Sequence, residues 1–157
     1  MPYTELLKKE NNLQSEASLT TVDSNEIIAR AVCEPKQYHS GKIQPNAFEQ
    51  VNYEPMSVLR MQSKTFDTCL KKTIQQITKG EKKYVGYATV KVEDIRNLKH
   101  EDKRLFAVLD SGSNDKPSHA DVIATKKVVK FTSLSGENLA NFLVSKLFRV
   151  FSKTLNT

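Results

Sequence analysis

The sequence predicts a single α+β domain whose sheet is mixed or mostly antiparallel, with a central helix and a C-terminal amphipathic helix. Its 157 residues match the size of one hydrophobic core. Hydrophobic residues make up 38% and charged residues 27% of the chain, which is typical of globular proteins and excludes a collagen-like or wholly disordered chain. The apolar segments read as two strands, a helix, several strands and a final helix, an order that favours an α+β architecture.

The chain divides into three predicted segments. Residues 1–25 are a polar N-terminal arm, because Ser, Thr, Asn and Glu predominate there. The first dozen of these residues can form a short helix, which is marginally stable unless it docks on another surface. The α+β core spans 26–134, and 135–157 are predicted to be an amphipathic helix packed on that core. A membrane-surface or partner-binding role is the alternative for this last helix.

Two apolar runs early in the core predict strands, and each contains an arginine. Residues 26–33 predict a central strand interrupted by Arg30, and 56–61 predict a second strand that ends near Arg60. The remaining elements follow from apolar spacing and from Pro and Gly residues. They are a long loop at 34–48, a helix from 65 that stops at Gly80, strands at 84–92, 104–109, 119–124 and 128–131, a short helix at 92–96, a turn-rich loop at 110–118, and the terminal helix from 136 to 155.

The two strand arginines are the most informative charged residues. An arginine is costly to bury unless it meets an anion or several hydrogen-bond acceptors. One interpretation is an internal ion pair, for example between Arg30 and Asp121. The other is a site for a phosphate or similar anion. The residues predicted for that anion site are Arg30, Arg60, Ser57 and His39.

His119 and Asp121 are a candidate catalytic pair. They stand two residues apart, so on a strand they point to one face and can share a proton or a ligand. A structural histidine at a strand start is the alternative. We expect no metal site and no cofactor, because the three histidines are dispersed and no Cys-x-x-Cys or His-Glu-x-x-His pair occurs. The segment from His39 to Lys42 lacks the full phosphate-binding loop pattern.

Five lysines form the densest linear cluster of positive charge. Beside Tyr84 and Tyr87, they can follow a nucleic-acid backbone, or they can simply keep the surface solvated. The whole chain has 24 Lys+Arg against 18 Asp+Glu, and this net charge of +6 is too modest to decide between nucleic-acid binding and a solvated surface. The lysines predicted to bind nucleic acid are Lys71, Lys72, Lys79, Lys82 and Lys83.

The expected cellular compartment of the protein follows from the targeting and membrane segments that the sequence lacks. It shows no signal peptide and no apolar run of roughly 20 residues, so we expect a cytoplasmic protein with no membrane partner. Cys33 and Cys69 lie in apolar patterns that predict buried, unpaired thiols, which fit a reducing compartment.

Four short motifs resemble a family of small uncharacterised bacterial proteins. They are A-R-A-V at 29–32, G-K-I-x-P-x-A-F at 41–48, S-V-x-R at 57–60 and H-A-D-V at 119–122. This resemblance implies a bacterial source and no particular activity. The same region is also similar to ADP-ribosyltransferase toxins, whose first-strand arginine and second-strand serine correspond to Arg30 and Ser57. The sequence shows no catalytic glutamate on a later strand to complete that set.

These observations predict a small intracellular basic binding module that belongs to a bacterial protein assembly or a nucleic-acid-associated one. The polar arm is the segment expected to bind a protein partner, and nucleic acid is the second candidate partner. The alternative is an enzyme that acts on a nucleotide or nucleic acid, by ADP-ribosyltransferase-like or phosphoryl chemistry. It would use Arg30 and Arg60 to hold phosphate and His119 with Asp121 near the reacting atom. The sequence does not decide between the two.

Overall fold

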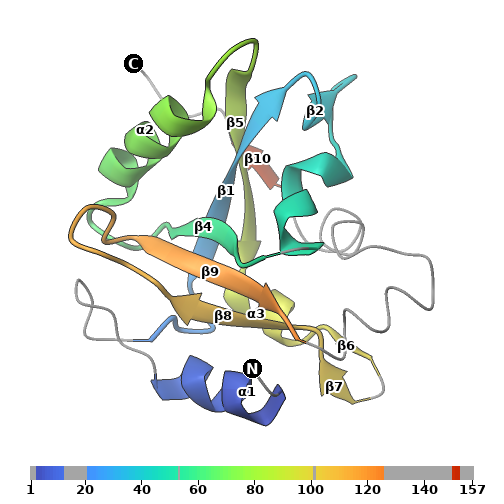
Figure 1. Ribbon diagram of the computed structural model, residues 1–157, viewed down its shortest axis with the longest axis vertical. Coiled ribbons are helices and arrows are strands. Elements are labelled where there is room, and N and C mark those ends of the chain that lie inside the picture. Colours follow the sequence, from blue (N-terminus) through green and yellow to red (C-terminus); the bar gives the residue numbers. More distant parts are fainter. Residues whose placement is uncertain (1–2, 13–20, 53, 101, 126–149, 153–157) are drawn as a thin grey trace.

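The computed structural model describes residues 3–12, 21–52, 54–100, 102–125 and 150–152, and it shows one antiparallel sheet with helices on both faces (Figure 1). The sheet has six strands in the order β10-β5-β1-β4-β9-β8, and every neighbouring pair is antiparallel. The predicted α+β class is therefore confirmed. The strands are β1 (Ile27–Glu34), β4 (Met56–Arg60), β5 (Lys83–Lys91), β8 (Phe106–Asp110), β9 (His119–Ala124) and β10 (Val150–Ser152).

Helices and two short ribbons complete the described structure. The ribbons are β2 (Tyr38–His39) with β3 (Lys42–Ile43), and β6 (Lys99–His100) with β7 (Lys103–Arg104). The helices are α1 (Tyr3–Asn12), α2 (Phe66–Ile77), α3 (Val92–Arg96) and the 3₁₀ helix η1 (Pro45–Asn52). None of the helices in these described residues is long and apolar enough to cross a membrane.

Alternating side chains of the strands build a core on each face of the sheet. On one face, buried strand residues such as Ile28 and Met56 pack with Phe48 of η1 and Ile95 of α3. On the other face, α2 places Phe66, Cys69 and Leu70 against Ala29, Leu59 and Tyr87. This period of two along the strands fixes which side chains face α2. Arg30 lies with Ile28 on the opposite face, where it contacts Ala47 and Gln50 of η1.

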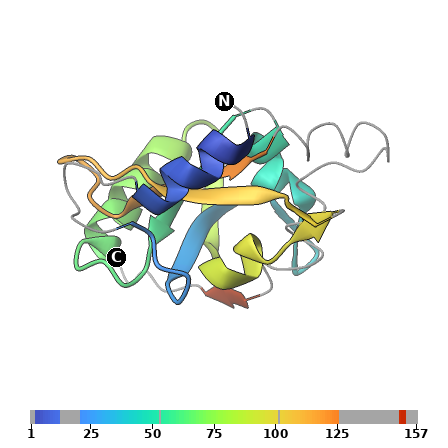
Figure 2. The same ribbon diagram turned by 90° about the horizontal axis from the view of Figure 1, so that it is seen from below.

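The N-terminal helix α1 docks on the edge strand β8 (Figures 1 and 2). Leu6 is buried against Ala107 and Leu109. Glu10 accepts a hydrogen bond of 2.6 Å from the backbone N–H of Val108, a group that a sheet edge would otherwise leave unpaired. The carboxylate of Glu10 also pairs with two arginines, Arg96 at 3.2 Å and Arg104 at 2.8 Å. Residues 3–12 are therefore part of the folded core rather than a separate arm, and 13–20 lie outside the described residues.

The C-terminal segment differs from its prediction where the structure describes it. Val150–Ser152 form strand β10, which pairs with Thr89, Ala88 and Tyr87 of β5. The prediction of a helix is wrong at these three residues, because hydrogen bonding to the sheet edge overrides the helical spacing of the local apolar residues. The rest of the predicted helix at 135–157 and the predicted strand at 128–131 lie outside the described residues.

Candidate anion-binding site

The sheet opens between two of its central strands, and Arg30 occupies the opening. Strands β1 and β4 pair only at Ile28 with Arg60 and at Ala29 with Leu59, and beyond these residues they diverge (Figure 1). Arg30 is the first residue of β1 past the paired part. At Ser57 of β4, the backbone groups therefore face the side chain of Arg30. In a regular sheet, the backbone of the neighbouring strand would bond to these groups.

Neutral oxygen atoms hold the guanidinium of Arg30. Its Nε donates to the Ala47 carbonyl at 3.1 Å, and its Nη1 donates to Gln50 Oε1 at 3.0 Å and to the Ser57 carbonyl at 2.8 Å. Gln50 Oε1 also accepts from the Ser57 N–H at 3.4 Å, so Arg30 and Gln50 together satisfy the exposed backbone of β4. Within the described part of the chain no carboxylate contacts Arg30, so the predicted ion pair with Asp121 does not form.

Burial changes the acidity of Arg30 without removing its charge. Desolvation lowers the pKa of Arg30 from 12.5 to about 10, because the surrounding protein solvates the cation less well than water does. A pKa of about 10 still leaves the guanidinium protonated at neutral pH. The opening between β1 and β4 thus carries a permanent positive charge with only dipoles around it.

A cavity of about 340 Å³ lies beside Arg30, between the opened sheet and α2. Its other basic lining residues come from three further parts of the chain, namely Lys82 before β5, Lys116 in the loop between β8 and β9, and His119 at the start of β9. None of the described residues that line the cavity is an Asp or Glu. The uncharged polar lining residues are Gln37, Gln50, Ser57, Thr73 and Gln76. The cavity is therefore basic and rich in hydrogen-bonding groups.

The loop between β8 and β9 is fastened onto α2 and so helps to form the cavity wall. Lys116 Nζ donates to Gln76 Oε1 of α2. On the same side, Lys72 Nζ donates to the Asp115 carbonyl at 2.8 Å and pairs with the Asp115 carboxylate at 3.1 Å. These contacts place Lys116 at the cavity. The charge of Lys72 is balanced by Asp115.

His119 lies in a small polar cluster at the cavity wall. Its Nδ1 is 2.6 Å from Ser111 Oγ, and its Nε2 is 4.0 Å from Asp121 Oδ1. Desolvation raises the pKa of Asp121, and the nearby His119 and a hydrogen bond from Ser111 oppose that rise. The predicted sharing of one strand face by His119 and Asp121 is consistent with these contacts. Ser111, in the turn-rich loop directly before β9, was not identified from the sequence.

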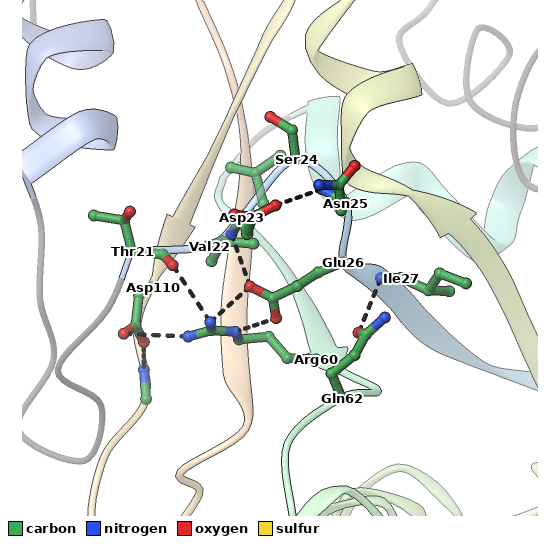
Figure 3. A network of polar contacts seen from close by, with 12 residues as sticks. Thr21, Val22, Asp23, Ser24, Asn25, Glu26, Ile27, Arg60, Gln62 and Asp110 are labelled. Carbon is green, nitrogen blue, oxygen red and sulfur yellow. Dashed lines mark hydrogen bonds and ion pairs between the residues drawn. The ribbon is translucent and has the colours of Figure 1, made fainter.

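Arg60 does not line this cavity, and two carboxylates neutralise its charge (Figure 3). Its guanidinium pairs with Glu26 at 2.7 Å and with Asp110 at 3.4 Å, and Nη2 also lies 3.4 Å from the Thr21 carbonyl. The hydrogen bond with Glu26 raises the pKa of Arg60. Arg60 therefore fulfils the other prediction for a buried arginine, an internal ion pair, and it fastens residues 21–26 to the sheet.

The other residues predicted from the sequence fall into two groups. Lys82 lines the cavity, whereas Lys71, Lys79 and Lys83 are exposed outside it. His39 is exposed on the β2–β3 ribbon and does not line the cavity. Both cysteines are buried free thiols, as predicted.

Sequence reasoning missed several lining residues, because nothing in the local pattern distinguishes them from ordinary loop or helix residues. Four of these missed residues are Lys116, Gln37, Gln50 and Gln76.

Comparisons with known proteins do not assign this site. No protein-family model, curated protein or solved structure matches the chain. Among the described residues, no group of three or more His, Cys, Asp or Glu side chains is close enough to hold a metal ion. The resemblances to small bacterial proteins and to ADP-ribosyltransferases stay predictions.

Proposed function

We propose that the protein is a basic binding module whose cavity between β1, β4 and α2 holds the phosphate group of a nucleotide. The observation that carries this proposal is Arg30, a desolvated cation that lines the cavity and contacts only neutral acceptors. Its Nη2 makes no hydrogen bond to any described residue, so donors remain for a ligand.

Charge balance favours an anionic ligand. Desolvating a cation without an opposite charge is unfavourable, and an incoming anion recovers that energy through charge-assisted hydrogen bonds. Lys82 and Lys116 add two positive charges, and no carboxylate among the described lining residues competes with a ligand. A phosphate ester, which carries up to two negative charges and several acceptor oxygens, matches this set better than a single carboxylate does.

The size and polar lining favour a nucleotide over phosphate alone. Cavities that hold small organic ligands usually measure about 300 to 1,000 Å³, and this one is about 340 Å³. Amide side chains both donate and accept hydrogen bonds, which suits the edge of a nucleobase. Gln37 and Gln76 provide such groups around the space beside Arg30, whereas both ends of the Gln50 amide are already bonded within the protein.

Calorimetric titration of the full chain tests this function. Adenosine monophosphate and diphosphate should bind, and adenosine should bind at least about tenfold more weakly, because it lacks the phosphate that Arg30 and the lysines contact. Arg30→Gln should weaken nucleotide binding by about tenfold or more. The matched control is Lys83→Gln, which removes one exposed positive charge outside the cavity and should change the affinity by less than about twofold.

Three results of this titration would contradict the proposed function. They are equal binding of adenosine and its phosphates, an unchanged affinity of the Arg30→Gln variant, and no binding of any nucleotide. Circular dichroism of each variant shows whether a loss of binding reflects unfolding instead.

The Ser111–His119 contact favours a second candidate function, an enzyme that hydrolyses the bound phosphate ester. In that reaction water attacks phosphorus, the ester P–O bond breaks, and His119 passes the water's proton to the leaving oxygen. ADP-ribosyltransferase chemistry has less support, because the catalytic glutamate that the resemblance calls for is not among the described residues that line the cavity. Chromatography of the titration mixtures decides between the two functions. Release of phosphate that disappears in His119→Gln supports hydrolysis, and unchanged nucleotide supports binding alone.

Broader parts of the predicted role remain predictions. They are the bacterial source, the cytoplasmic location and the membership of a protein or nucleic-acid assembly. A protein partner that uses the N-terminal segment would have to accommodate the docked helix α1, because Leu6 and Glu10 are already engaged with the core.

A further inference from the structure

A second cavity adjoins the first one on the side of Lys82. It has a volume of about 570 Å³, and its lining residues come from the end of β1, the segment that follows it, η1 and the loop before β5. Cys33, Gln37 and Lys82 line both cavities. The two spaces therefore border each other at these residues.

Positive side chains continue from the first cavity into the second. Lys36 and Lys79 line the second cavity, and Lys82 lies at the boundary. All three lysines are exposed, and none of them forms an ion pair with a described residue. Glu34 and Glu81 also line this second space, so it is less positive than the first.

We infer that the natural ligand is the end of a single-stranded nucleic acid, with its terminal nucleotide in the cavity beside Arg30 and the following phosphates passing Lys82 toward Lys36 and Lys79. This inference rests on the proposed nucleotide-binding function and names the ligand class of the same site. No aromatic residue of the described chain lines either cavity, so base stacking contributes little. Phosphate contacts then dominate, and binding depends strongly on salt concentration.

Oligonucleotide length provides the test. The full chain is titrated with adenosine monophosphate and with 5′-phosphorylated oligoadenylates of two, three and six nucleotides. The affinity should rise by about tenfold or more between one and three nucleotides and then level off, because only the first few phosphates reach the lysines. The double variant Lys36→Gln/Lys79→Gln should lose that gain and keep the affinity for the monophosphate.

A double control separates local contacts from general charge. Lys71→Gln/Lys83→Gln also removes two positive charges from exposed positions, and neither lysine lines either of the two cavities. It should retain the length dependence. Lys36→Gln/Lys79→Gln should also lose two phosphate contacts. The slope of log affinity against log salt concentration should therefore become less steep by about 1.4, whereas the control should leave that slope almost unchanged.

The outcomes distinguish the two proposals. Binding of the monophosphate with no gain from added nucleotides overturns the strand-end inference and leaves the nucleotide function intact. An equal loss of the gain in the test and control variants also overturns the inference. Failure of every nucleotide to bind overturns the proposed function and the inference together. A length gain that requires Lys36 and Lys79 supports both.

Discussion

Arg30 and Arg60 lie on neighbouring strands, interrupt similar apolar sequences and have opposite surroundings. Arg60 sits where β1 and β4 are paired, opposite Ile28, and two carboxylates neutralise it. Arg30 sits where the same strands diverge, and only carbonyl and amide oxygens contact it. The difference lies in the acceptors that the fold supplies, because both side chains are guanidinium groups on strands of one sheet.

This contrast separates a structural arginine from one that is available to a ligand. The charge of Arg60 is already balanced, so an added anion would have to compete with Glu26 and Asp110. The charge of Arg30 is unbalanced, and the space beside it contains further cations. An unbalanced, partly buried charge reduces stability in the free protein, and proteins commonly accept such costs at binding sites.

The largest expected effect is on stability, from replacing Arg60. Arg60→Met leaves Glu26 and the fully buried Asp110 without their cation, which should lower the free energy of unfolding by about 3 to 5 kcal/mol. Arg30→Met leaves only neutral acceptors unpaired and should cost about 1 to 2 kcal/mol. Urea denaturation of both variants measures the difference. Equal losses would show that the two arginines are not distinguished by their partners.

The second prediction concerns a substitution that gives Arg30 a carboxylate partner, like those of Arg60. Gln50→Glu keeps the shape of the side chain that accepts from Arg30 Nη1 and adds a negative charge. The new charge should neutralise Arg30 and weaken nucleotide binding by about tenfold or more, because it competes with the phosphate. Gln50 Nε2 also donates to Glu54, and repulsion from that carboxylate limits any gain in stability to about 1 kcal/mol.

Calorimetry of the Gln50→Glu variant with adenosine monophosphate measures this effect, and Gln75→Glu on the exposed side of α2 is a control with the same change of charge. Unchanged affinity in Gln50→Glu would contradict a phosphate position beside Arg30. An equal decrease in both variants would attribute the effect to overall charge instead.

The sequence predicted α2 and the strands β1, β4, β5, β8 and β9 well, because alternating or three-and-four spacing of apolar residues reflects directly which face is buried. It also identified Arg30, Ser57, Lys82 and His119, four residues that line the cavity. It could not show which of two similar arginines would find carboxylates. Glu26 is 34 residues from Arg60 in the chain, and Asp110 reaches it only through the order of strands in the sheet.

The docking of the N-terminal helix and the position of Lys116 depend on long-range contacts, which the spacing of residues along the chain does not reveal. The N-terminal helix appears polar and marginal by itself, yet Glu10 is buried because Arg96, Arg104 and the free edge of β8 all provide partners. Lys116 lies in a turn, and only the packing of that turn on α2 brings it to the cavity. Long-range pairing decided both cases, so neither could be obtained from spacing along the chain.

Tyr84 extends the comparison to a neutral group, and its expected effect is the smallest. Its hydroxyl is buried without a hydrogen-bond partner in the described structure, and desolvation raises its pKa from 10.0 to about 12. The folded protein therefore keeps this proton at a pH where the unfolded chain loses it, so stability falls as pH rises from 10 toward 12. Tyr84→Phe should remove that contribution and change stability near pH 7 by no more than about 1 kcal/mol. Urea denaturation at pH 7 and pH 11 measures both effects. A large loss of stability at pH 7 would contradict this prediction, because it would mean that the hydroxyl makes a stabilising hydrogen bond in the folded protein.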